Sequence, residues 1–182
     1  MTVPLGVFRL ILATTTLVVS LHGTAAAAQS FLDQDAKAAL QSLYSTSPAA
    51  KTLAETARGI LIFPVITKAG FIVGAQGGEG VLFEKGKSVA HYSAGGGTLG
   101  MQAGMQSYAY ALFFMTDADL AYLRRSDGWS LGVGPNLVVV TSGAAKDFST
   151  TTGRQGVYAF IFEQKGLMAG VALAGQKISR IR

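Results

Sequence analysis

Glycine is the feature that most constrains the fold of this chain. The sequence has 23 glycines in 182 residues, and almost all of them follow Arg58. They have no collagen-like period and are interleaved with Val, Ile, Phe and Tyr. Because glycine permits tight turns, bulges and close approach of strands, this mixture predicts a mainly β domain after Arg58.

The N-terminus has the three parts of a secretory signal peptide. Arg9 is the only charge before Asp33, an apolar stretch runs from Leu10 to Leu21, and an alanine-rich run follows. Export removes such a segment. We therefore predict a signal peptide over residues 1–28, cleavage near Ala28, and a mature domain over 29–182 that is periplasmic or extracellular.

Composition excludes several classes of protein. The chain has no Cys, so an exported form has no disulfides and depends on packing for its stability. No mature segment reaches 18 continuous apolar residues, which predicts a mature chain without a transmembrane helix. The net charge of +5 suits an anionic partner. Nucleic acid is not expected as that partner, because no basic cluster or stacking motif accompanies the charge.

Helical periodicity precedes the glycine-rich part. Apolar residues recur at helical spacing over 32–58, with Asp33 as the expected cap of a first helix and Ser47-Pro48 as the start of a second. Thr116-Asp117-Ala118-Asp119 is typical of a capping box and predicts one short internal helix. The remainder reads as strands. We predict an α+β fold, with N-terminal helices packed on a curled or barrel-like antiparallel sheet.

Local signals divide the predicted sheet. Pro64 is expected to end a first buried strand, and Glu84–Lys87 and Glu163–Gly166 are expected to form hairpin turns. Gly95–Gly97 reads as a corner before a long alternating strand over Met101–Met115.

Catalytic and metal-binding residues are scarce. His91 is the only mature histidine, and we expect it to be isolated from any nucleophile or metal-ligand set. Gly95-x-Gly97-x-x-Gly100 matches a dinucleotide-binding string, but the segment after it alternates like a strand where that motif requires a helix. We predict a non-enzymatic protein with no catalytic residue, no metal and no cofactor.

Basic residues beside an aromatic residue are the best candidates for a binding site. Such groups can contact anionic lipid headgroups. Lys68 lies in a predicted turn, Lys85 and Lys87 lie at a predicted hairpin tip, and Arg124 and Arg125 end the predicted internal helix. The candidate lipid-binding residues are Lys68, Lys85, Lys87, Arg124, Arg125 and Trp129. The alternative is that these basic residues are ordinary solvated surface charges without a binding role.

Several motifs in order resemble the SYLF lipid-binding domain family. Arg58–Pro64, Lys68–Gly74 and Gly77–Leu82 resemble its opening signature, Gly97–Gly104 its central glycine-rich strand, and Lys165–Val171 its closing segment. The eukaryotic Trp-Ser-x-Pro segment is replaced by Val89–Ser93, so the resemblance is to the bacterial, exported branch.

The resemblance implies phospholipid binding. Eukaryotic members are associated with phosphoinositide membranes and actin, which do not suit an exported bacterial-type protein, so anionic phospholipid or a membrane surface is the expected partner. Two alternatives stay open from the residues alone. One is a small outer-membrane β-barrel, favoured by Gly, Tyr and alternation but not by the predicted helices or the C-terminal Arg182. The other is an envelope hydrolase acting on lipid or glycan through His91 or a carboxylate pair.

Overall fold

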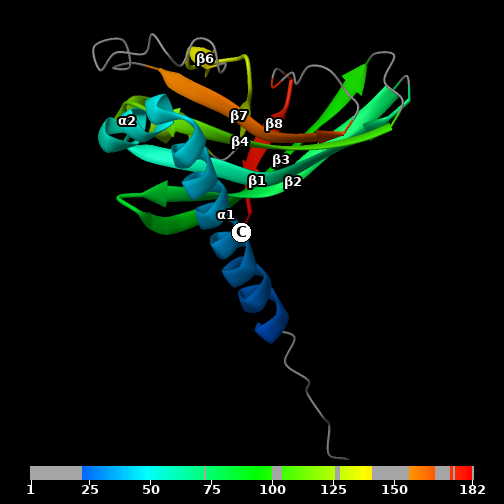
Figure 1. Ribbon diagram of the computed structural model, residues 1–182, viewed down its shortest axis with the longest axis horizontal. Helices are drawn as coiled ribbons and strands as arrows, with labels where there is room; N and C mark the ends of the chain where they lie inside the picture. The colour runs from blue at the N-terminus through cyan, green and yellow to red at the C-terminus, as the bar shows by residue number, and fades with distance from the viewer. Residues whose placement is uncertain are drawn as a thin grey trace, which may run out of the picture.

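A curled sheet of eight strands forms the centre of the molecule, and two N-terminal helices cover one of its faces (Figure 1). The computed structural model describes residues 22–71, 73–99, 104–125, 128–140, 156–166, 173 and 175–181. The helices are α1 (His22–Thr46), α2 (Pro48–Thr56) and α3 (Asp117–Leu123). The strands are β1 (Gly59–Gly70), β2 (Val73–Glu84), β3 (Lys87–Leu99), β4 (Gly104–Phe114), β5 (Trp129–Ser130), β6 (Leu137–Val140), β7 (Val157–Gly166) and β8 (Lys177–Arg180).

The strand order is β5-β8-β3-β2-β1-β4-β7-β6. All neighbouring strands are antiparallel except β6 and β7, which run parallel. The predicted α+β fold with a curled sheet and an internal helix is therefore confirmed, although the sheet is mixed. The C-terminal strand β8 pairs with β3 and β5, which joins segments far apart in the sequence.

Each face of the sheet carries its own core, although Val65 and Thr67 in the second half of β1 are exposed. Ile60 and Ile62 of β1 face the two N-terminal helices, where Ala36 and Leu43 of α1 pack on them; we name this side the helix face. Leu61, alternating with them, belongs to the concave side, which we name the inner face. Side chains of α3, the segment after it and the C-terminal segment fill this inner face: Leu120, Leu123, Trp129, Leu131 and Leu173.

Two helix caps and one hairpin turn form where the sequence predicts them. Ser47 caps α2 and accepts a hydrogen bond from the Ala50 amide at 3.3 Å. Lys85 and Gly86 form a two-residue hairpin turn with φ of +50° and +76°. Thr116 caps α3, accepting from the Asp119 amide at 3.1 Å and donating to its carboxylate at 2.6 Å. These three predictions are confirmed.

Three local predictions are wrong, and in each a tertiary partner overrides the local signal. β1 continues through Pro64 with a register shift on both sides, because a bulge accommodates the missing N–H. Gly95–Gly97 lies inside β3, paired with β2. Glu163–Gly166 continues β7, with Glu163 at φ +51° beside a register shift against β4. The polar, turn-rich sequence of residues 142–153 also predicts an exposed loop, and this segment lies outside the described residues.

Asp33 does not cap a helix, because α1 begins upstream at His22. Its carboxylate instead ties α1 to the start of β3. Asp33 Oδ1 accepts a hydrogen bond from Ser88 Oγ at 3.0 Å and lies 2.9 Å from His91 Nε2. Both side chains of the Asp33–His91 pair are mostly shielded from solvent. We name this group the α1 latch; it shows that His91 is not isolated.

The bulge in β1 requires glycine on the neighbouring strand. A Cβ at Gly80 would lie 2.6 Å from the Ile62 carbonyl oxygen and 2.6 Å from Phe63 Cδ1. The Phe63 ring has little freedom to move, because it is fully buried and stacks on Tyr110 with ring centroids 4.7 Å apart. The sheet therefore has no room for a side chain at Gly80.

We predict that Gly80→Ala lowers the free energy of unfolding by about 1–3 kcal/mol, the usual cost of overpacking a core. Gly97→Ala is the matched control, since nothing lies within 4 Å of a Cβ there. Urea denaturation of both variants checks this. Equal midpoints for Gly80→Ala and the parent would contradict the proposed close approach.

We predict that Asp33→Ala lowers the free energy of unfolding by about 1–2 kcal/mol, because Ser88 and His91 both lose a charged partner. Asp35→Ala is the control, since Asp35 is exposed on the same helix. Chemical denaturation followed by circular dichroism measures both changes. If the two variants have the same stability, the latch does not hold α1.

Candidate functional site

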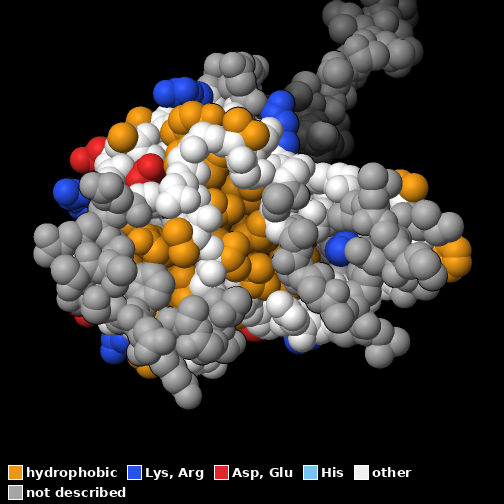
Figure 2. Space-filling model, turned by 90° about the horizontal axis from the view of Figure 1, so that it is seen from above, with side chains coloured by type: hydrophobic (Ala, Val, Ile, Leu, Met, Phe, Trp, Pro, Cys, Tyr) orange, Lys and Arg blue, Asp and Glu red, His pale blue; other side chains and the backbone are white. Residues whose placement is uncertain are grey.

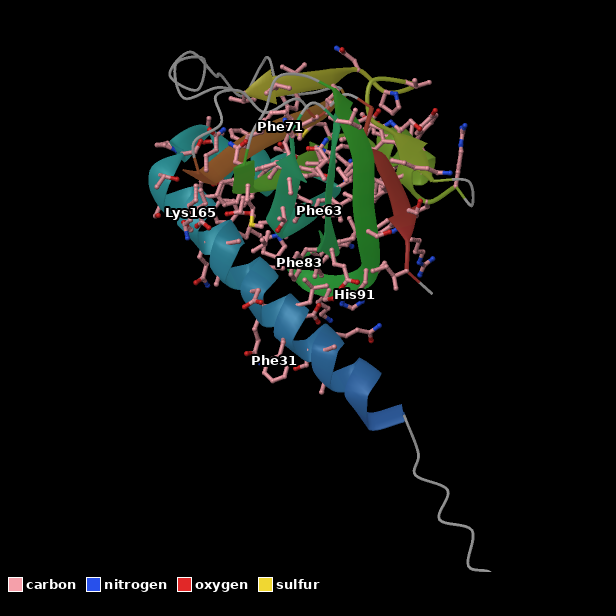
Figure 3. All side chains as sticks on the ribbon, turned by 90° about the vertical axis from the view of Figure 1, so that its right-hand side faces the viewer. Phe31, Phe63, Phe71, Phe83, His91 and Lys165 are labelled. Carbon is pink, nitrogen blue, oxygen red and sulfur yellow. The ribbon has the colours of Figure 1, made fainter. Side chains whose placement is uncertain are left out.

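A pocket of about 450 Å³ lies between the N-terminal helices and the β2–β3 hairpin. We name it the helix–hairpin pocket. Its apolar floor is formed by Leu40, Ala54, Ala57, Ile60 and Phe83, and its polar rim by Lys37, Gln41, Tyr44, Glu55 and Lys85, with Gly59 and Gly86 completing the lining. Phe83 lies between the sheet and α1 in Figure 3.

Helix periodicity and the hairpin turn position the rim. Lys37, Gln41 and Tyr44 lie at i, i+4 and i+7 of α1, so they share one face of that helix. The Lys85-Gly86 turn places the ammonium group of Lys85 at the same pocket. Two cations from distant segments therefore stand over an apolar floor, with Glu55 as the one acidic lining residue.

Tyr44 supplies a hydroxyl donor to this pocket. Burial raises the pKa of Tyr44 to about 12, because the phenolate would lose solvation. The hydroxyl is therefore protonated at neutral pH and can donate to an anionic oxygen. Lys37 and Lys85 form none of the ion pairs found in the described part of the chain. The pocket thus offers positive charge and a donor above a hydrophobic surface.

The structure separates the predicted lipid-binding residues. Lys85 lines the helix–hairpin pocket, and Lys87 is exposed beside it at the start of β3. Arg124 instead forms an ion pair with Glu84. Arg125 lies over the Tyr122 ring, 4.5 Å from its centroid. Both arginines are held by neighbours, so the hairpin lysines are the better placed pair.

Two of the predicted residues are not at the surface. Trp129 is 1% exposed and packs on Phe114 and Tyr122, with its indole N–H donating to the Val133 carbonyl at 2.9 Å. Its expected contact with a membrane is therefore wrong for this conformation. Lys68 lies inside β1 and is 4% exposed, so the predicted turn there is also wrong. Sequence periodicity could not reveal that the inner face closes over both.

A buried polar network on the inner face was not foreseen from the sequence. The Tyr108 hydroxyl donates to Gln76 Oε1 at 2.9 Å and accepts from Gln176 Nε2 at 3.0 Å. The Tyr110 hydroxyl donates to Gln176 Oε1 at 3.2 Å. The one signal for it was that Gln106, Tyr108 and Tyr110 alternate along one strand; their partners come from β2 and from the segment before β8.

The α1 latch contains Ser, His and Asp, but its geometry is not that of a nucleophile and its base. Nucleophilic catalysis needs the hydroxyl to donate to the histidine. Here Ser88 Oγ donates to Asp33, and His91 approaches the same oxygen. The carboxylate therefore bridges two groups, which suits the fastening of a helix to a sheet.

Metal-ligand clusters and membrane-spanning helices are both absent from the described residues. Within the described ranges, no group of three or more His, Cys, Asp or Glu residues could hold a metal ion. No helix in the same part of the chain has the length and apolarity needed to cross a membrane.

Comparison with known proteins gives one match. A family model described as Ysc84, Las17-binding protein actin regulator, matches residues 95–181. No curated protein matches the chain. The matched segment includes the Gly97–Gly104 and Lys165–Val171 motifs that resemble SYLF domains, while the motifs over Arg58–Leu82 precede it. The match confirms the resemblance to the Ysc84 (SYLF) family over residues 95–181.

Proposed function

We propose that the protein is a non-enzymatic phospholipid-binding protein of the cell envelope, which meets anionic headgroups through Lys85, Lys87 and Lys37. The observation that carries the proposal is the helix–hairpin pocket, where cations surround an apolar floor. The match to a family of binding domains supports a role without catalysis.

The chemistry of the pocket fits an amphiphile. The floor favours hydrocarbon, which gains about 25 cal/mol per Å² of apolar surface removed from water. The rim favours phosphate oxygens, because ammonium groups and a protonated tyrosine can all donate to them. A volume of about 450 Å³ is in the range of pockets for drug-sized ligands and small for a whole two-chain phospholipid. Part of a bound lipid would therefore remain in the membrane.

The surface beside the pocket is consistent with this orientation. Lys87 is exposed at the same hairpin, and Phe31 is exposed on α1 beyond the sheet (Figure 3). An exposed aromatic and nearby cations are the groups that interfacial binding uses.

The proposed location is outside the cytoplasm. The predicted cleavage site near Ala28 falls within α1, upstream of the latch residue Asp33. Removal of residues 1–28 would therefore leave the helix residues that contact the sheet, from Leu32 onwards, in place.

Mass spectrometry of the protein recovered from cell envelope tests this location. We predict a first residue at or beside Gln29. A chain that still begins at Met1 in that fraction would contradict processing.

We predict that Lys37→Glu with Lys85→Glu weakens binding to vesicles of phosphatidylglycerol and phosphatidylcholine several-fold. Each basic group near an anionic surface contributes about 1 kcal/mol, so reversing two charges removes the attraction of both. Co-sedimentation at low and high salt measures the effect, and salt should weaken binding of the parent.

Lys51→Glu with Lys165→Glu is the control for net charge, because both lysines are exposed and neither lines the pocket. A similar loss in this control would show that general charge, and not the pocket rim, attracts the vesicle. Binding that is equal for neutral and anionic vesicles and insensitive to salt would refute the basic rim.

A further inference from the structure

Lys68 is a buried cation on the inner face of the sheet. It lies opposite Gln76 on β2 and opposite Gln106 on β4, and cross-strand partners share a face. Ile66, two residues earlier on β1, belongs to the inner-face core. Residues two apart on a strand share a face, so Lys68 also lies on the inner face. The exposed fractions are 4% for Lys68, 7% for Gln76 and 2% for Gln106. One charged and two amide side chains thus form a polar row across three central strands.

The Lys68 ammonium has no protein counter-charge in the described part of the chain. The ion pairs found there join Arg58 with Asp117, His91 with Asp33, and Arg124 with Glu84. No side-chain hydrogen bond joins the Lys68 ammonium to a described residue either. Burial of the side chain removes much of the hydration of the ammonium, which is unfavourable without a partner. Among the described residues, the Lys68 nitrogen is not one of the buried atoms that lack a partner, so it still reaches solvent, and an anion that enters from solvent can bind it.

The neighbouring hydrogen-bond network points its donors toward the same place. Tyr110 donates to Gln176, Gln176 donates to Tyr108, and Tyr108 donates to Gln76 Oε1. Gln76 accepts the hydrogen bond from Tyr108 through its oxygen, so its amide N–H groups remain as donors. Gln76 ends this series of hydrogen bonds and lies opposite Lys68.

Burial keeps the tyrosines of this network in their donating form. It raises the pKa of Tyr108 to about 12, and it raises the pKa of Tyr110 further above its ordinary range. Both hydroxyls therefore carry their protons at physiological pH and can donate to the glutamine oxygens. The row offers donors and a positive charge, which is the chemistry that recognises an oxyanion.

We propose that the inner face holds a second binding site, in which Lys68 and the Gln76 amide bind the phosphate or carboxylate oxygens of an anionic ligand. This site lies on the opposite face of the sheet from the helix–hairpin pocket. It does not depend on the function proposed for that pocket.

The position of Lys68 near a strand end suits the entry of a ligand with an apolar part. β1 ends two residues later at Gly70, and Phe71 beyond it is 70% exposed. Val73 and Met105, at the adjoining ends of β2 and β4, are also largely exposed. Figure 3 places Phe71 at the end of the sheet away from His91. Seen from the side opposite to the projecting end of α1, hydrophobic side chains gather in a hollow (Figure 2).

Titration calorimetry on the full chain tests the site with two probes: inorganic phosphate, and dihexanoyl phosphatidic acid as a soluble lipid with the same headgroup. We expect at least one of them to bind the parent, and Lys68→Met to bind it about 30-fold more weakly, as when one partner of a buried charge pair is lost. Binding of both probes identifies a site for free oxyanion. Binding of the lipid alone identifies a headgroup site.

Lys68→Gln provides a second variant that keeps a polar side chain, in case Lys68→Met does not fold. Lys51→Glu is the control, because Lys51 is exposed on α2 and lines neither site, and it should bind the soluble probes as the parent does. The proposal is overturned if neither probe binds the parent. It is equally overturned if a folded Lys68 variant binds them as tightly as the parent.

Discussion

Burial of the first half of β1, residues 59–64, on both of its faces is the constraint on which the rest of the structure depends. It is the central strand, paired with β2 and β4, and its side chains alternate between two cores. A strand of this kind must find cover on each side. The N-terminal helices cover the helix face, and α3 with the C-terminal segment covers the inner face. The curl of the sheet and the close approach at Gly80 follow from the bulge at Pro64 within this strand.

Features with a local cause could be predicted from the sequence, while features with a distant partner could not. Ser47, the Lys85-Gly86 turn and the Thr116 cap depend on backbone groups within three residues, so their signals lie in the adjacent sequence. Glu163–Gly166 has the same turn-like composition as the true hairpin, yet pairing with β4 keeps it in a strand. Nothing near Lys177–Arg180 indicates that this strand joins β3 and β5.

The candidate site was predicted in part for the same reason. Lys85 was recognised because a lysine in a two-residue turn must be at the surface. Lys37 and Tyr44 were not, because their role depends on which face of α1 meets the hairpin. The sequence predicts Lys68 in a surface turn and Trp129 beside the arginines at the end of the internal helix, whereas closure of the inner face buries both. Basic and aromatic residues therefore indicated a binding protein but not the place of each group.

The α1 latch connects the fold with both proposed sites. Asp33, Lys37, Gln41 and Tyr44 lie close to one line along α1, so the contact that fixes Asp33 against Ser88 and His91 also fixes the rotation of the helix. That rotation presents Lys37 and Tyr44 to the hairpin and turns Ala36 and Leu43 toward the sheet. The residues that alternate with those facing α1 point to the other side of the same strands. They form the inner face, where Lys68 lies. The period of two in β1 thus separates a pocket rimmed by exposed lysines from a mostly buried cationic row on the other face. The two sites can differ in the anion they accept, because the buried row leaves less room for water around a bound anion.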